Sequence, residues 1–180
     1  MSRRHQSLQQ RQVGRAWWLA LLLCCLALSP LSSQAEERAK DPTVLEVIDA
    51  YGERLFSLPL VEDDGWCLGW NHSVAKFTVL DCYRFREGRM WLERSHQPDF
   101  AAGLGHTEGR GEQISDGQGG YWIVDIDEPV PGSRYVLRVG SAAVDHRLIW
   151  DSPEGQRQAS LSDIAAGQRV TLQLHKPDDV

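Results

Sequence analysis

Residues 65–86, GWCLGWNHSVAKFTVLDCYRFR, decide the fold of this chain. Within them Trp66, Leu68 and Trp70 occupy every second position, and a second β-rich run, residues 77–86, follows a short break. Successive side chains of a β-strand point to opposite faces, so a period of two predicts strands. The two runs therefore predict an antiparallel hairpin that turns at residues 73–76.

The cysteines test the register of this hairpin. Opposed residues of an antiparallel pair have a constant sum of residue numbers, and the midpoint between Cys67 and Cys82 falls between Val74 and Ala75. The expected turn has the same centre, so the register sets the two cysteines opposite each other. Directly opposed cysteines can bond when they form a non-hydrogen-bonded pair. We predict this disulfide, which stabilises the fold by about 3 kcal/mol in the chain-entropy model.

Short β-rich runs separated by glycine, proline and acidic turns continue on both sides of the hairpin. One of them leaves two structures open, because residues 43–52 have partial helical spacing but contain Gly52 and many β-branched side chains. We favour two strands there, with a helix as the alternative. The further expected strands are 43–49, 54–60, 90–96, 121–126, 135–139, 147–150 and 169–175.

About eight or nine short strands predict an all-β, single-domain β-sandwich or barrel, since both architectures protect sheet edges. Residues 161–165 are expected to form one short helical turn near the C-terminus, capped by Ser160 or Ser162. Residues 97–120 are polar and rich in glycine, and we expect a long loop there that is either functional or a plain surface excursion.

The first 35 residues have the features of a cleavable Sec-type signal peptide. Four arginines and no acid precede an apolar run from Ala16 to Leu28, which is shorter than the roughly 20 residues that span a bilayer. Ser33-Gln34-Ala35 offers a cleavage site after Ala35. Residues 36–42 are then a flexible leader and residues 43–180 one β domain. An uncleaved anchor is the alternative.

Removal of residues 1–35 takes away four basic residues and no acidic ones, which changes the formal net charge from −6 to −10. Such a chain is repelled by nucleic acid and by anionic membrane surfaces. The processed chain keeps two cysteines, an even number suited to an oxidising compartment. We expect a periplasmic protein that does not insert into the membrane once its signal is removed.

Catalytic and metal-binding patterns are weak. His72 and Ser73 are adjacent, so in a strand they point to opposite faces and cannot act as a base and its nucleophile. The five histidines after residue 35 include no close-spaced ligand pair. Asp125, Asp127 and Glu128 suit either a calcium or sugar site or, as we favour, a solvated strand end. We expect no enzyme activity, cofactor or metal.

Several short motifs, in order along the chain, resemble the family catalogued as domain of unknown function 1850. In the signature of that family an aromatic residue, a variable residue and His-Ser-Val precede a basic residue and an acidic pair. Lys76 fits the basic position and Asp81 one of the acids, whereas Leu80 replaces the other. The other similar segments are Phe100-Ala101-Ala102-Gly103-Leu104, Gly120-Tyr121-Trp122-Ile123, Leu137-Arg138-Val139-Gly140 and Asp145-His146.

Members of this family are small exported bacterial proteins, often encoded beside TRAP-type transporters that work with TAXI-class periplasmic receptors. The resemblance implies a non-enzymatic periplasmic accessory of a solute uptake system. Its partner would be a periplasmic solute-binding receptor or a membrane permease, and the family supplies no catalytic residue. The candidate binding residues are Trp70, His72, Ser73, Lys76, Asp81, Gly103, Leu104 and His146.

A ligand carrier is the alternative function. In that hypothesis a closed barrel holds an apolar or organic-acid solute among Trp66, Trp70, Tyr83 and Trp122. A carrier differs from an accessory because it responds to its solute without a protein partner.

Overall fold

The computed structural model describes residues 42–72, 77–98 and 109–176. All of them belong to one compact unit, Lys40–Val180. The expected signal peptide, the residues 73–76 and 99–108, and the last four residues lie outside this description.

The predicted hairpin is confirmed. Strand β3 (Gly65–Asn71) pairs antiparallel with β4 (Thr78–Arg86). Cys67 lies opposite Cys82 with 4.0 Å between the Cα atoms, and the two are joined by a disulfide. A hydrogen bond from the His72 N–H to the Phe77 carbonyl oxygen, 2.8 Å long, continues the pairing beyond the strands. The register therefore agrees with the one that the midpoint between the cysteines predicts.

A second tight hairpin extends this sheet. Strand β5 (Arg89–Pro98) follows β4 after the two residues Glu87 and Gly88, both of which have positive φ. Positive φ at both positions defines the turn type whose twist matches that of the strands. Four more strands belong to the sheet, namely β6 (Glu112–Ser115), β7 (Gly120–Val124), β10 (Arg147–Ser152) and β11 (Gly155–Ser160). The strand order is β11-β10-β3-β4-β5-β7-β6.

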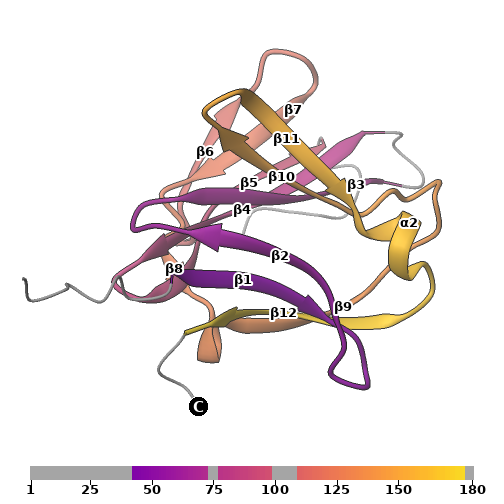
Figure 1. The fold of residues 1–180 in the computed structure, drawn as a ribbon. Coiled ribbons are helices and arrows are strands. Elements are labelled where there is room, and N and C mark those ends of the chain that lie inside the picture. The colour runs from indigo at the N-terminus through magenta and orange to yellow at the C-terminus, as the bar shows by residue number, and fades with distance from the viewer. Residues whose placement is uncertain (1–41, 73–76, 99–108, 177–180) are drawn as a thin grey trace, which may run out of the picture. The chain divides into compact units, whose positions relative to one another are not determined.

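The smaller sheet has the order β2-β1-β12-β9 (Figure 1). It contains β1 (Thr43–Ile48), β2 (Arg54–Leu60), β9 (Arg134–Arg138) and β12 (Arg169–His175). The helix alternative for residues 43–52 is thus wrong. Leu45 and Val47 alternate along β1 and are fully buried, whereas residues 49–53 form a tight turn held by the Asp49 carboxylate.

Three strands were not predicted. β6 (Glu112–Ser115) lies within the expected loop 97–120, and β5 also enters that loop as far as Pro98. β8 (Glu128–Pro129) has only two residues, and β11 (Gly155–Ser160) contains no large apolar side chain. All residues of β6 and β8 are exposed, and so are most of β11. Strands that bury so little apolar surface leave no periodic signal in the sequence.

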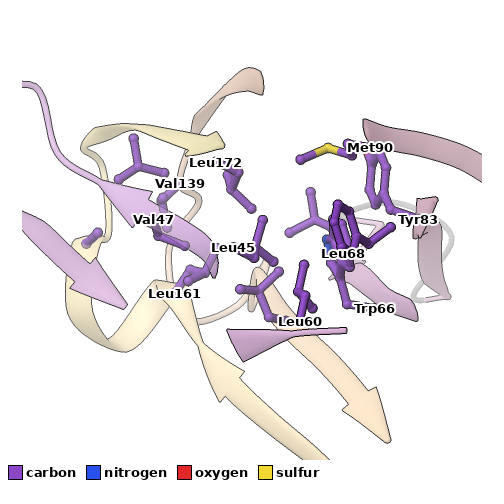
Figure 2. Close-up of a cluster of buried hydrophobic side chains, with 14 residues drawn as sticks. Leu45, Val47, Leu60, Trp66, Leu68, Tyr83, Met90, Val139, Leu161 and Leu172 are labelled. Carbon is purple, nitrogen blue, oxygen red and sulfur yellow. The ribbon is translucent and has the colours of Figure 1, made fainter. Parts of the chain in front are cut away.

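The two sheets pack face to face around the main hydrophobic core, so the fold is a sandwich. In the described residues the sheets share no strand pairing, and the barrel alternative is wrong. Figure 2 shows side chains from both sheets meeting in this core. Its labelled members are Leu45, Val47, Leu60, Trp66, Leu68, Tyr83, Met90, Val139, Leu161 and Leu172.

The expected helical turn is present as α2 (Leu161–Ala165). The Ser160 hydroxyl accepts from the N–H of Asp163 at 3.1 Å and so caps the first turn. Leu161 and Ala165 are buried. The short 3₁₀ segment η2 (Pro131–Ser133) leads from β8 in the larger sheet to β9 in the smaller one. In the part of the chain that is described, no helix is both long and apolar enough for a membrane span.

Candidate functional site

The structure describes four of the eight predicted binding residues. Trp70 lies near the end of β3, and His72 directly follows that strand. Asp81 lies in β4, and His146 precedes β10. The other four predicted residues, Ser73, Lys76, Gly103 and Leu104, lie outside the described residues.

Trp70 and His146 come together although 76 positions separate them in the sequence. Strand β10 pairs with β3 so that Arg147 lies opposite Gly69, and one further step brings His146 beside Trp70. Their ring centroids are 6.1 Å apart. Trp70 packs against the core, so the two rings lie at the border between the core and one end of the larger sheet.

The hydrogen bonds of His146 are directed into the protein. Its Nδ1 accepts from the N–H of Gly140 at 2.8 Å, so the proton of the neutral ring is on Nε2. Burial lowers the pKa of His146, and Asp145 acts weakly in the opposite sense. The backbone N–H of His146 donates to the hydroxyl of Ser162 at 2.9 Å. His146 is therefore a neutral side chain that fixes the backbone around it.

Ser162 and Gly140 complete this arrangement. The Ser162 hydroxyl donates to the carbonyl oxygen of Gly140 at 3.0 Å, and Ser162 itself is buried. A Cβ at Gly140 would lie 2.6 Å from the Cβ of Val144, which is closer than side chains approach. Only glycine fits at this position, and the close approach holds the turn 141–144 against residue 140.

This turn lies beside the end of β3. The N–H of Asn71 donates to the carbonyl oxygen of Val144 at 2.7 Å, and its side-chain amide is 3.4 Å from the carbonyl oxygen of Ala143. Residues 141–143 are exposed. We use the term motif surface for Asn71, His72 and the turn 141–144.

Asp81 belongs to a separate buried polar cluster on the core-facing side of the larger sheet. It lies opposite Ser95 of β5, whose hydroxyl donates to the Asp81 carboxylate at 2.7 Å. The side-chain amide of Gln97 in turn donates to Ser95 at 3.0 Å. Burial raises the pKa of Asp81, while the Ser95 hydrogen bond and the charge of Arg110 partly offset that rise.

Sequence reasoning missed Ser95 and Gln97. Both occupy core-facing positions of β5, and Ser95 is 2 % exposed. The available signal was Ser95 in the predicted strand 90–96, because a polar side chain at a core-facing position needs a hydrogen-bond partner; Gln97 fell in the expected loop 97–120 and gave no such signal. Without the pairing of β5 to β4, however, their partner could not be identified.

A second histidine, His96, lies on the opposite face of the same strand. Its Nε2 is 2.8 Å from the carboxylate of Asp116, and its ring stacks on Trp122 with 4.5 Å between centroids. Asp116 also accepts from the backbone N–H groups of Gln118 and Gly120. The pKa of Asp116 is lowered, most strongly by the hydrogen bond from the Gln118 N–H. The contact with His96 and the bond from the Gly120 N–H act in the same direction. The pair fastens the β6–β7 hairpin to β5.

Two of the other acidic groups weighed from the sequence, Asp127 and Glu128, are paired with arginines. A carboxylate oxygen of Asp127 lies 3.6 Å from a guanidinium nitrogen of Arg86. Glu128 forms a bidentate ion pair with Arg110, with nitrogen–oxygen distances of 2.9 and 3.0 Å. This pairing agrees with a solvated strand end, which is the interpretation that the sequence favours. Among the described residues, no three His, Cys, Asp or Glu side chains come close enough to hold a metal ion.

The aromatic residues of the carrier hypothesis do not face one interior. Trp66 and Tyr83 stack within the core with 5.8 Å between ring centroids. Trp122 lies opposite His96 and is next to the buried Tyr121 in the strand, so it points to the outer face of the larger sheet. A single ligand therefore cannot contact all four aromatic residues.

These features define an antiparallel two-sheet β-sandwich with a disulfide between neighbouring strands and motif residues at one end of its larger sheet. Residues 67–155 match the family model described as domain of unknown function (DUF1850), and the chain belongs to this family. The match covers the hairpin, the Asp81–Ser95 cluster and His146. No curated protein and no solved structure matches the chain.

Proposed function

We propose that this chain is a non-enzymatic accessory protein of a solute uptake system and that it binds a transporter component through the motif surface. The resemblance to the family suggested this role. The observation that carries it is the use that the fold makes of the ionisable motif residues. His146 accepts a hydrogen bond from the backbone N–H of Gly140, and the Asp81 carboxylate accepts one from the Ser95 hydroxyl.

Hydrogen bonds of this kind give both groups a structural role, and those of His146 position the motif surface. A general base needs a free lone pair within hydrogen-bond reach of its substrate. The lone pair on the Nδ1 of His146 is already directed at Gly140, and burial favours the neutral ring. The result is a rigid turn beside Asn71 and His72 whose small side chains, Ala142 and Ala143, are exposed.

The disulfide and the N-terminal sequence both support a periplasmic location. Disulfides persist in oxidising compartments such as the periplasm. The Cys67–Cys82 bond therefore supports folding outside the cytoplasm, as do the arginine-rich start and the apolar run of the first 35 residues. We propose that the processed chain works in the periplasm, with a solute receptor or a permease as its partner.

Site-specific photo-crosslinking in the host cell tests this proposal. A photoreactive amino acid at Ala142 lies on the motif surface, whereas the same residue at Tyr51, which is 95 % exposed in the smaller sheet's β1–β2 turn, is the control. We expect position 142 to form a covalent product with the receptor or the permease and position 51 to form none. Absence of any product from position 142, or equal products from both positions, contradicts the proposal.

A further inference from the structure

Strand β9 is an open edge of the smaller sheet, since in the described part of the chain it pairs with β12 alone (Figure 1). The N–H of Val139 donates to Gln168, and its carbonyl oxygen accepts from Gly167, so the backbone groups of Val139 face β12. Backbone groups alternate in direction along a strand. The N–H and C=O groups of Val136 and Arg138 therefore point to the open edge.

The same residues present their side chains to solvent. Arg134, Val136 and Arg138 are exposed, whereas the intervening Tyr135 and Leu137 pack against the core. Val136 is 56 % exposed, which makes it one of the few large apolar side chains on the surface of the described domain. The edge thus offers an apolar side chain between two arginines, with free backbone groups next to it.

The charge of this edge opposes that of the whole chain. Arg138 lies directly opposite Arg169 of β12, and like charges in that position destabilise a sheet. Within the described residues, no carboxylate lies at ion-pair distance from Arg134, Arg138 or Arg169. The chain itself has a formal net charge of −6. Among the described residues, then, these three arginines have no ion-pair partner and could attract an acidic group from another molecule.

Protection against self-association is the simpler explanation of charge on an edge strand. That explanation accounts for the arginines but not for Val136, because an exposed apolar side chain at the centre of an open edge promotes pairing with other chains. Nor does protection require one arginine to lie against another.

We propose that β9 binds an extended acidic segment of a partner protein, which adds to the smaller sheet as a further strand. Backbone hydrogen bonds to Val136 and Arg138 supply the affinity, and the alternating side chains supply the selectivity. Side chains of neighbouring strands pair across the sheet, and every second residue of a strand lies on the same face. A matching five-residue segment therefore has acidic residues at its first and fifth positions and an apolar residue at its third. The apolar position then lies beside Val136, with the two acids beside Arg134 and Arg138.

This proposal does not depend on the transporter role. The proposed segment would pair with β9 of the smaller sheet, whereas the motif surface consists of the end of β3 and the turn 141–144 that precedes β10. A peptide assay with the purified chain contains no transporter component. Its outcome is therefore independent of the crosslinking experiment, and either proposal can fail while the other holds.

Fluorescence anisotropy with a labelled synthetic peptide tests the proposal. The peptide contains Glu-Thr-Val-Thr-Glu between flexible ends, and the protein is the full chain purified after export. We expect saturable binding that Arg138→Glu weakens by about tenfold or more, because reversal of a close charge turns attraction into repulsion. The variant Arg134→Glu/Arg138→Glu should instead bind a peptide with lysine in place of both glutamates.

Two further variants separate strand addition from general attraction. Arg157→Glu makes the same charge change on an exposed arginine of β11 and should leave binding unchanged. Val136→Pro removes an N–H that points to the open edge, a position where strands tolerate proline, and should abolish binding while the thermal midpoint stays nearly the same. Absence of binding to the wild type, an equal loss with Arg157→Glu, or full binding by Val136→Pro would overturn the proposal.

Discussion

The Asp81 carboxylate and the Ser95 hydroxyl, 2.7 Å apart, form a polar contact on the core side of the larger sheet. Because burial raises the folded-state pKa of Asp81 above its ordinary value of 3.8, the folded chain binds a proton at this group more tightly than the unfolded chain does. This group therefore contributes most to stability at low pH, and its contribution falls as pH rises from 3.8 through the raised folded value.

Replacement of Ser95 by alanine tests this contact. Loss of the donor leaves a buried carboxylate without its partner, so we expect Ser95→Ala to lower the free energy of unfolding by about 1–3 kcal/mol at pH 7. The loss should shrink as the pH falls through the raised folded-state pKa of Asp81, because the carboxyl then takes up a proton. Urea unfolding across this pH range measures it. In an Asp81→Asn background the pH dependence of the loss should disappear, and its persistence there would show that another group is responsible.

The short helix α2 carries two neighbouring serines with different tasks. Ser160 caps its first turn at a partly exposed position, whereas the hydroxyl of the buried Ser162 accepts from the N–H of His146 and donates to the carbonyl oxygen of Gly140. A lost cap costs about 1 kcal/mol, whereas buried groups left without partners cost about 1–3 kcal/mol. We expect Ser162→Ala to destabilise the fold more than Ser160→Ala does in urea unfolding. The reverse order would contradict the role of Ser162 in holding the motif surface.

Taken as a whole, the domain has one main core to which both sheets contribute. A shared core predicts a single unfolding transition. The Cys67–Cys82 bond closes a loop with a sequence separation of 15, so removal of both cysteines should lower the free energy of unfolding by about 3 kcal/mol. Tryptophan fluorescence reports the larger sheet and far-ultraviolet circular dichroism reports both sheets. We expect coincident curves before and after the substitution, and separate midpoints would show that the sheets unfold independently.

The sequence by itself determined the all-β class, nine of the strands, the short helix and the β3–β4 register. Each of these follows from local features, namely alternating side chains, turn residues and a pair of cysteines that share a centre with their turn. The fully exposed strand β6 escaped because a strand that buries no apolar surface has no alternation to detect.

Only the tertiary structure decided which distant residues meet. Asp81 faces Ser95 because of the β4–β5 register, which shifts between Cys82 and Tyr83, and His146 lies beside Trp70 because β10 pairs with β3. Neither pairing can be read from the local sequence, since the hydrogen bonds between strands join backbone groups that every sequence has. The choice of partner strand comes from burial of the shared core, which is a property of the whole chain.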